Sequence, residues 1–455
     1  APSGPAPSGP APSGPAPSAD LDDALSTPTE DSVYPDVGDP GIDALRYRLD
    51  LDWDPATDTL TGSQTLVFRA AETDDSFQLD LGAPLAVAAL TLDGVPVEHT
   101  HTGKDLVVEA PVVADERYEL VLDYAGTPRP VPAPSTRSDM STLGFTVDAE
   151  HQAWTMQEPF GAFTWYAVND HPSDKAFYDV RLSVPSPWTG IAGGAQTSST
   201  DDGTTTTTTY VLDEPAASYL VTVAFGDYTR VDDVGPRGLP ITYWVPRGRD
   251  DLLPGLRTAP EAVRFLEQYL GPYPFATAGI VVVDSESGME TQTMITLGDQ
   301  PYSTSPPVVV HELAHQWWGD AVTPDDWRDV WMNEGMAMYL QLIWQAEQDG
   351  VPLDRHLESY RLAEAEQRAL AGPPGAYDPE QFGASNVYYG PALMWHALRE
   401  RVGDEVLFAI MRGWPVAQDG ASTDRETLLA YVEDQTGEEL DDFWDAWLLD
   451  ERTPG

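Results

Sequence analysis

Two histidines and a glutamate within a five-residue run have the residue types and the spacing that are typical of a metal site with a general base beside it. His311 and His315 lie four residues apart, so on a helix their imidazoles project from the same face, one turn apart. Two neutral imidazoles on one face can hold a zinc ion, and a carboxylate from elsewhere can complete a three-ligand site with one position open for water. Glu312, beside the first histidine, is then placed to take a proton from that water. The run predicts a metallohydrolase with one zinc ion per chain.

Two helices must position these side chains. A proline pair and Gly319 suit the start and the end of a first helix, which is expected to span residues 306–318. Residues 323–326, Thr-Pro-Asp-Asp, have the pattern of an N-cap, a proline at the first helical position and acidic residues in the first turn. They predict a second helix that runs to about residue 350, because apolar residues then recur at helical spacing.

Glu334 is the expected third ligand. Eighteen residues separate it from His315, and it lies two turns into the second expected helix, so a helical hairpin brings it back beside the histidines. Asp329 is expected either to hold a ligand histidine through a hydrogen bond or to be a solvated acid at the helix start. The other nearby carboxylates, Asp320, Asp325 and Asp326, fall in the loop or the first turn.

A longer pattern surrounds the two histidines. The sequence HELAHQWWGD occupies residues 311–320, and Trp327-x-Asp329-x-Trp331-x-Asn333-Glu334-Gly335-x-Ala337 follows it. Together the two stretches resemble the zinc signature of the aminopeptidase N family of gluzincins, which also includes the leukotriene hydrolase type. The resemblance covers roughly residues 40–450. It implies a zinc peptidase with a thermolysin-like catalytic domain.

Two further stretches agree with this family in order and position. Residues 287–291, Ser-Gly-Met-Glu-Thr, resemble its exopeptidase motif Gly-x-Met-Glu-Asn, and Glu158-Pro159 begins a second family block. The resemblance implies that Glu290 and Glu158 bind the free amine of the substrate, beside Gly288 and Met289. The motif's first glycine and its asparagine are serine and threonine here, and Met156 stands where the family has a glutamine before its first amine-binding glutamate.

The residues 387–393, Val-Tyr-Tyr-Gly-Pro-Ala-Leu, resemble the family segment that carries a tyrosine. In the family this tyrosine stabilises the transition state. The usual Lys-Gly pair is Gly390-Pro391 in this chain, which makes Tyr388 the better match. Tyr389 is the alternative.

The chain is expected to divide into a tail and two domains, in an α+β multidomain fold. Ala-Pro-Ser-Gly-Pro repeats three times through Pro15, and this low-complexity composition predicts a disordered tail over residues 1–39. Apolar residues alternate from Leu45 to Trp53, and similar runs predict an N-terminal antiparallel β-domain over residues 40–235. The period then becomes helical, so residues 236–455 are expected to form the thermolysin-like, mainly helical zinc peptidase domain.

Composition limits the partners. The net charge is −51, from 75 acidic and 24 basic residues, which argues against nucleic acid and anionic membrane surfaces because both would be repelled. The chain has no apolar run of membrane-spanning length. It begins at Ala1 without the features of a signal peptide, so we expect a secreted or cell-surface enzyme from which that peptide has been removed. We expect a monomer that acts on peptides with a free N-terminus.

Two other function classes are possible. A thermolysin-type endopeptidase would share the two helices, but it typically has one more residue before its glutamate and lacks the exopeptidase block, so Glu158 and Glu290 argue against it. An inactive peptide-binding homologue would be expected to lose Glu312, a zinc ligand or the tyrosine, and the chain retains them all. The sequence therefore favours a zinc-dependent aminopeptidase in which Glu312 is the general base.

Overall fold

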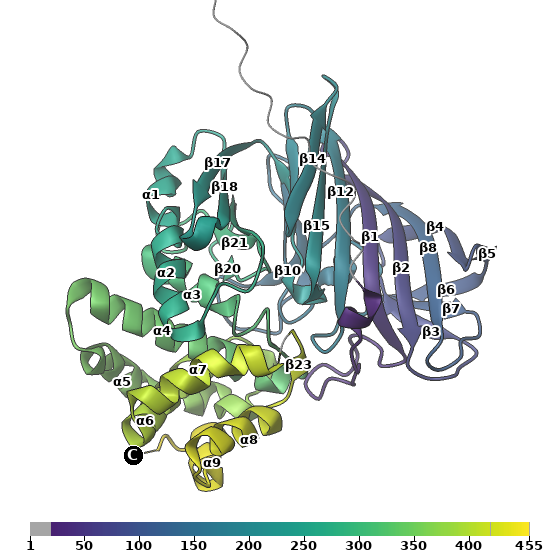
Figure 1. Cartoon of the computed structure of the whole chain (residues 1–455). Helices are drawn as coiled ribbons and strands as arrows, with labels where there is room; N and C mark the ends of the chain where they lie inside the picture. Colours follow the sequence, from purple (N-terminus) through teal and green to yellow (C-terminus); the bar gives the residue numbers. More distant parts are fainter. Residues whose placement is uncertain (1–19, 419, 455) are drawn as a thin grey trace, which may run out of the picture.

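The protein consists of a β-rich N-terminal domain followed by a mainly helical domain (Figure 1). This computed structural model describes residues 20–418 and 420–454. The arrangement confirms the fold class expected from the sequence. The Ala-Pro-Ser-Gly-Pro repeats fall within residues 1–19, outside the described residues.

An eight-stranded sheet, in the order β14-β15-β12-β1-β2-β8-β4-β5, forms the larger part of the first domain. Alternate side chains of β1 from Tyr47 to Trp53 are buried, as the pattern predicted, because successive residues of a strand point to opposite faces. The strands are β1 (Ile42–Asp54), β2 (Thr59–Ala70), β4 (Leu85–Leu92), β5 (Val95–Pro96), β8 (Arg117–Gly126), β12 (Lys175–Pro185), β14 (Ala195–Asp201) and β15 (Thr205–Ala217).

This sheet departs from the expected pattern in two places. Leu45 was expected on the face of Tyr47, but a β-bulge at Leu45 breaks the alternation, and Leu45 packs in a separate cluster with Ala24 and Phe177. The sheet is also not wholly antiparallel, because β1 pairs with β12 in parallel. Between β8 and β12 the chain forms the strands of another sheet, and it then returns to the free edge of β1 in the same direction as β1.

Two smaller sheets complete the first domain. The five-stranded sheet β13-β16-β11-β10-β9 packs against the second domain, and a three-stranded sheet has the order β3-β7-β6. The strands are β3 (Phe77–Asp80), β6 (Glu98–Thr102), β7 (Asp105–Glu109), β9 (Val131–Pro132), β10 (Thr142–Val147), β11 (Ala153–Met156), β13 (Thr189–Ala192) and β16 (Val223–Gly226).

Residues 20–39 pack against both domains, which corrects the expectation of a disordered tail for this part of it. Asp31 accepts hydrogen bonds from the backbone N–H groups of Val33 (2.8 Å) and Tyr34 (2.7 Å), and from that of Trp327 (2.7 Å) in the second domain. Val33 is buried in the core of the second domain. Local composition could not predict this order, because the partners of these few side chains lie about 300 residues further along the chain.

The second domain combines the sheet β17-β18-β19-β21-β20 with nine helices among the described residues. Its first strand begins at Tyr228, so the division between the domains lies near residue 227 and not at the expected residue 235. No helix within residues 20–418 and 420–454 is long and apolar enough to cross a membrane. The elements are β17 (Tyr228–Val234), β18 (Pro240–Pro246), α1 (Leu253–Leu256), α2 (Ala259–Leu270), β19 (Ala278–Val283), β20 (Gly288–Met289), β21 (Ile295–Gly298), α3 (Pro306–His315), α4 (Trp331–Asp349), α5 (Leu353–Ala371), α6 (Asn386–Val402), α7 (Asp404–Gln418), α8 (Arg425–Thr436) and α9 (Asp441–Leu448).

The connection between α3 and α4 is longer than expected. α3 ends at His315, and α4 begins at Trp331, so Glu334 lies in the first turn of α4 and not two turns into the helix. Residues 323–326 do not start this helix, because β22 (Thr323–Pro324) pairs in parallel with β23 (Ser422–Thr423) and holds the chain extended. Asp326 caps the short 3-10 helix Trp327–Asp329 instead. A partner strand about a hundred residues away thus overrides a local helix-start pattern.

Candidate active site

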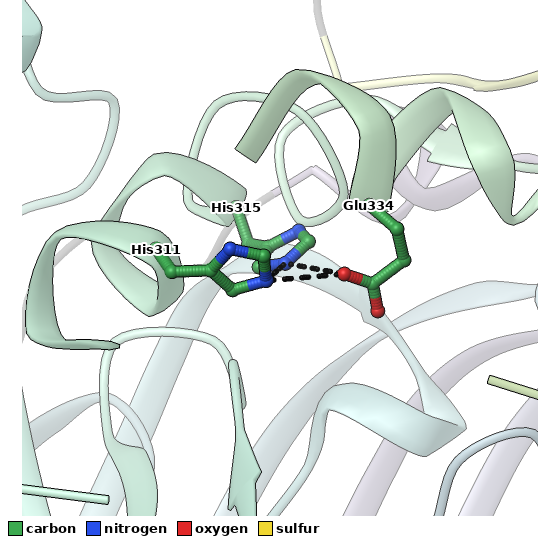
Figure 2. A group of neighbouring side chains, drawn as sticks. All are labelled: His311, His315 and Glu334. Carbon is green, nitrogen blue, oxygen red and sulfur yellow. Dashed lines mark hydrogen bonds and ion pairs between the residues drawn. The ribbon is translucent and has the colours of Figure 1, made fainter. Parts of the chain in front are cut away.

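Three side chains that could bind a metal meet between α3 and α4. His311 and His315 leave the same face of α3, Glu334 leaves α4, and Figure 2 shows the three pointing toward one another. Glu334 Oε2 lies 3.1 Å from His311 Nε2 and 3.3 Å from His315 Nε2, and the two Nε2 atoms are 3.2 Å apart. The structure therefore brings together the three residues that the spacing singled out, and we call them the metal triangle.

The size and chemistry of the metal triangle fit a zinc ion. Ligand bonds of about 2.0–2.1 Å at tetrahedral angles place the donor atoms roughly 3.3–3.4 Å apart, close to the three distances of the triangle. His315 Nδ1 lies 3.1 Å from the carbonyl oxygen of Trp318, a contact that keeps a proton on Nδ1 and leaves Nε2 free for a metal. Burial lowers the pKa of His311, which favours the neutral form that metals bind.

Charge also favours a cation in the triangle. Although burial lowers the pKa of His315, the carboxylates of Glu290 and Glu334 raise it well above its ordinary value. A positive charge at this position is therefore stabilised, and a metal cation can supply it in place of a proton.

Asp329 does neither of the two things expected of it. It is buried, and it accepts hydrogen bonds from Trp331 Nε1 at 3.2 Å and from the backbone N–H of Arg425 at 3.1 Å. Asp329 thus joins the start of α4 to the start of α8 and contacts no ligand histidine. A backbone carbonyl holds His315 instead, and residue types could not reveal this because every residue carries a carbonyl group.

A cavity of about 560 Å³ opens between the two domains beside the metal triangle. Its lining comes from the first domain, including the loop between β9 and β10, and from β20, α3, α4 and α6 of the second domain. All the site residues expected from the sequence line it: Glu158, Gly288, Met289, Glu290, His311, Glu312, His315, Glu334 and Tyr388.

Glu312 lines this cavity beside the metal triangle, with a carboxylate oxygen within 4.8 Å of a ring nitrogen of His315. A Cβ atom on Gly288 would stand 2.8 Å from Glu312 Oε1, so the glycine allows β20 to approach the carboxylate closely. Burial, and then the charge of Glu290, raises the pKa of Glu312 to about 8. A divalent cation in the triangle opposes this shift and favours the carboxylate, which is the form that can accept a proton.

Tyr388 contacts the metal triangle directly. Its hydroxyl donates a hydrogen bond to Glu334 Oε1 at 3.0 Å, and its ring stacks on that of His311, with 5.9 Å between the ring centres. Tyr389 also lines the cavity, but its ring packs edge-on against Tyr360 at 4.5 Å. The geometry favours Tyr388 over Tyr389 for a contact with a substrate oxygen.

Glu158 and Glu290 present two unpaired carboxylates to the cavity. Carboxylate oxygens of Glu158, Glu290 and Glu334 lie within 4.8 Å of one another, and all three residues are buried. The Oε1 atoms of Glu158 and Glu290 have no hydrogen-bond partner among the described residues. Burial, and then the neighbouring Glu290, raises the pKa of Glu158 well above its ordinary value. An ammonium group bound between the two carboxylates would offset this cost.

Glu158 is held by the end of β11. The side-chain amide of the preceding residue, Gln157, donates to the carbonyl oxygens of Ser218 and Val221, each at 2.8 Å. Its carbonyl oxygen accepts a hydrogen bond from Trp165 Nε1 at 2.8 Å. These buried contacts anchor the chain just before Glu158.

Gln316 ties the metal-binding helix to the segment that carries Glu290, a function that the sequence did not predict. Its Nε2 donates to the carbonyl oxygen of Glu290 at 2.9 Å, and its Oε1 accepts from the backbone N–H of Thr293 at 2.9 Å. Thr293 has a φ of 63°, a strained value for a β-branched residue. The position of Gln316 directly after His315 was the available signal, but an amide side chain has no spacing rule that names its partners.

The first prediction concerns metal binding. We expect purified protein dialysed against zinc to hold one ion per chain, and His315→Ala to hold less than a tenth of that under the same conditions, because two ligands remain and the ring that Trp318 orients is gone. Inductively coupled plasma mass spectrometry measures the ratio. His356→Ala is the matched control, since His356 is paired with Asp349 on the surface and should leave the ratio at one. Equal zinc contents in the two variants would contradict the site.

Comparison with known proteins places both domains among peptidases. The Peptidase M1 N-terminal domain matches residues 43–220, and the Peptidase family M1 domain matches residues 255–447. The chain is 26% identical over 222 residues to Aminopeptidase M1 of Arabidopsis thaliana, covering 45% of this chain and 25% of that protein. It is 26% identical over 330 residues to Aminopeptidase N of Streptomyces lividans, covering 67% of this chain and 37% of that protein. The chain thus spans less than half the length of either relative.

Solved structures match over nearly the whole chain. An M1 zinc metallopeptidase from Deinococcus radiodurans shares 28% identity and superimposes with a TM-score of 0.83, covering 93% of this chain and 97% of that one. A mutant of an M1 zinc metallopeptidase from the same organism, bound to a Tyr-Ser-Ala substrate, shares 28% identity with a TM-score of 0.84 and covers 93% and 98%. Each of these matches therefore covers nearly the full length of both chains.

Proposed function

The chain belongs to peptidase family M1, and we propose that it is a zinc-dependent aminopeptidase that removes residues one at a time from the free N-terminus of peptides. The observation that carries the proposal is the pair of buried, unpaired carboxylates of Glu158 and Glu290, within reach of the metal triangle. A metal triangle alone suits any metallohydrolase. Two unpaired carboxylates beside the metal triangle suit a substrate whose positively charged ammonium group is next to the scissile bond.

The side chains have complementary tasks in the proposed reaction. A zinc ion held by His311, His315 and Glu334 supplies Lewis acidity, which makes water more acidic and a carbonyl more electrophilic. Glu312 accepts the proton of the attacking water and delivers it to the leaving amine. Glu158 and Glu290 bind the ammonium group of the substrate and thereby set which peptide bond lies beside Glu312.

Tyr388 completes the proposed reaction by donating a hydrogen bond to the carbonyl oxygen as negative charge develops there. In the structure its hydroxyl donates to Glu334 Oε1, so its proton already faces the metal triangle. Tyr388 and Glu312 then act on opposite partners of the reaction, the developing oxyanion and the attacking water.

The tyrosine gives the second prediction. We expect Tyr388→Phe to lower kcat by roughly a hundredfold or more with a smaller change in KM, because the hydrogen bond strengthens mainly in the transition state. Tyr389→Phe is the matched control, and it should change kcat less than threefold. Steady-state kinetics with an aminoacyl-anilide substrate measures both. The reverse order of effects would transfer the role to Tyr389.

A time course of peptide digestion tests the proposed function. Mass spectrometry of an unblocked peptide should show a ladder that shortens by one residue at a time from the N-terminus. Internal cuts at comparable rates would assign the chain to the endopeptidases instead. No cleavage by the zinc-loaded protein would favour an inactive peptide-binding homologue.

The proposal includes the finer expectations about location and assembly. The expected state is a monomer, because a net charge of −51 opposes association of copies, and the expected location is outside the cell or at its surface. Sedimentation of the purified protein and fractionation of the source culture test these two expectations. A dimer, or activity confined to the cell lysate, would refute the corresponding one.

A further inference from the structure

One arginine of the first domain reaches into the active site of the second. Arg137 lies in the loop between β9 and β10, and its Nη1 donates a hydrogen bond to the hydroxyl oxygen of Tyr388 at 3.2 Å. The same nitrogen lies 3.3 Å from the carbonyl oxygen of Gly383, just before α6, the helix that carries Tyr388. Among the lining residues of the cavity that the structure describes, Arg137 is the only lysine or arginine, whereas seven are aspartate or glutamate.

Contacts within the loop and contacts with the segment before α6 hold Arg137 in place. Asp139 pairs with the guanidinium group through two contacts, at 3.1 Å to Nε and 2.6 Å to Nη2, and this fixes the plane of the group. Ser135 Oγ donates to the carbonyl oxygen of Phe382 at 2.7 Å, and the backbone N–H of Phe382 donates to the carbonyl oxygen of Pro134 at 2.9 Å. The loop therefore runs along the segment before α6 and brings Arg137 to a defined position over Tyr388.

The direction of the Tyr388 proton follows from this contact. A guanidinium group can only donate hydrogen bonds, so the Tyr388 oxygen is the acceptor toward Arg137. A tyrosine hydroxyl has a single proton, which must then point away from Arg137. In the structure it points to Glu334 Oε1, a residue of the metal triangle. Without Arg137 the Tyr388 hydroxyl would lose this donor and would be free to rotate its proton away from Glu334.

We propose that Arg137 is a positioning residue of the reaction: it orients the Tyr388 hydroxyl so that its proton faces the metal triangle and the substrate oxygen. This inference rests on the proposed function for its consequence in catalysis. The first domain then takes part in two ways. It binds the substrate amine through Glu158, and through Arg137 it also acts in the step in which negative charge develops on the substrate oxygen. A competing use of the same arginine, binding the C-terminal carboxylate of a short peptide, predicts different kinetics.

A double-mutant cycle tests the inference. We expect Arg137→Met to lower kcat by about tenfold to thirtyfold with little change in KM, and Arg137→Lys to restore part of the loss, because the lost orientation affects a contact made in the transition state. In the Tyr388→Phe background, Arg137→Met should have less than a threefold effect, since the hydroxyl that it orients is absent. Arg249→Met is the matched control: Arg249 forms ion pairs with Asp251 and Asp299 but does not contact Tyr388.

Two kinetic results would overturn the inference. Equal losses in the presence and absence of the Tyr388 hydroxyl would show that Arg137 acts independently of it. A loss confined to KM, which disappears when the peptide carries a C-terminal amide, would assign Arg137 to substrate carboxylate binding. Thermal unfolding of each variant is measured alongside, so that a loss of folded protein is not counted as a catalytic effect.

A spectroscopic measurement distinguishes failure of this inference from failure of the proposed function. In protein labelled with 3-fluorotyrosine, Tyr388→Phe identifies the ¹⁹F resonance of Tyr388. Arg137→Met should shift that resonance, and Arg249→Met should leave it in place. If the resonance shifts but the wild-type protein cleaves no peptide, the contact between Arg137 and Tyr388 is supported and the aminopeptidase assignment is wrong. If peptides are cleaved but the resonance does not move, Arg137 does not position Tyr388.

Discussion

Replacing Glu312 by glutamine is expected to lower kcat by roughly 10²- to 10⁴-fold while the protein keeps one zinc ion per chain. The amide has nearly the same shape as the carboxylate but cannot accept the proton of the attacking water. Glu312 is not part of the metal triangle, so the zinc content should not change. Kinetics with an aminoacyl-anilide substrate and metal analysis of the same preparation measure the two quantities together.

Glu286→Gln is the matched control for this experiment. Glu286 lines the same cavity, but it is exposed to solvent, and the proposed reaction gives it no task. The same chemical change should therefore alter kcat less than threefold. If Glu312→Gln retained a tenth or more of the wild-type kcat, another group would have to be the general base. If it lost its zinc, the glutamate would have a structural task near the metal triangle that the geometry does not indicate.

The second large effect is the discrimination against a blocked N-terminus. Acetylation removes the positive charge of the substrate and leaves Glu158 and Glu290 buried without a partner. Removing one partner of a buried charge pair costs about 2–5 kcal/mol, so kcat/KM for an N-acetylated peptide should fall roughly 30- to 5,000-fold. A matched pair of peptides that differ only in the acetyl group, followed by mass spectrometry, measures the ratio.

Glu290→Gln should reduce this discrimination chiefly by lowering kcat/KM for the peptide with a free amine, and Glu158→Gln should act in the same direction. Each variant also relieves the repulsion between two buried carboxylates, so both should unfold at a higher temperature than the wild type in the absence of a peptide. Asp284→Gln, at an exposed position of the same cavity, should change neither quantity. A wild-type enzyme that cleaves both peptides at similar rates would remove the basis for calling it an aminopeptidase.

The two buried carboxylates lower the stability of the protein without substrate, and a bound substrate removes this effect. Burial, and then the mutual repulsion of the carboxylates, raises the pKa of Glu158, and burial also raises that of Glu290, so ionising either group opposes folding. A bound ammonium group removes this penalty. The groups that make the empty protein less stable are thus those that give the proposed reaction its specificity.

Local spacing determined the chemistry that could be predicted from the sequence. Helical periodicity places His311 and His315 on one face whatever surrounds the helix, because four residues complete about one turn. Strand alternation predicted the buried face of β1 for a similar local reason. The third ligand, Glu334, followed from a hairpin of two helices, and this prediction tolerated an error in where the second helix begins, because the residue belongs to that helix in either case.

Features that depend on contacts between residues far apart in the sequence could be seen only in the tertiary structure. The pairing of β22 with β23 cancelled a helix start at residues 323–326, and a few contacts with the second domain ordered residues 20–39. Arg137 and Tyr388 meet although about 250 residues separate them. Backbone carbonyls such as that of Trp318, and amides such as that of Gln316, carry no pattern in the sequence, because their partners are set by how the domains pack and not by spacing along one element. The sequence by itself therefore determined which groups could react, and the packing of the two domains decided how those groups are oriented.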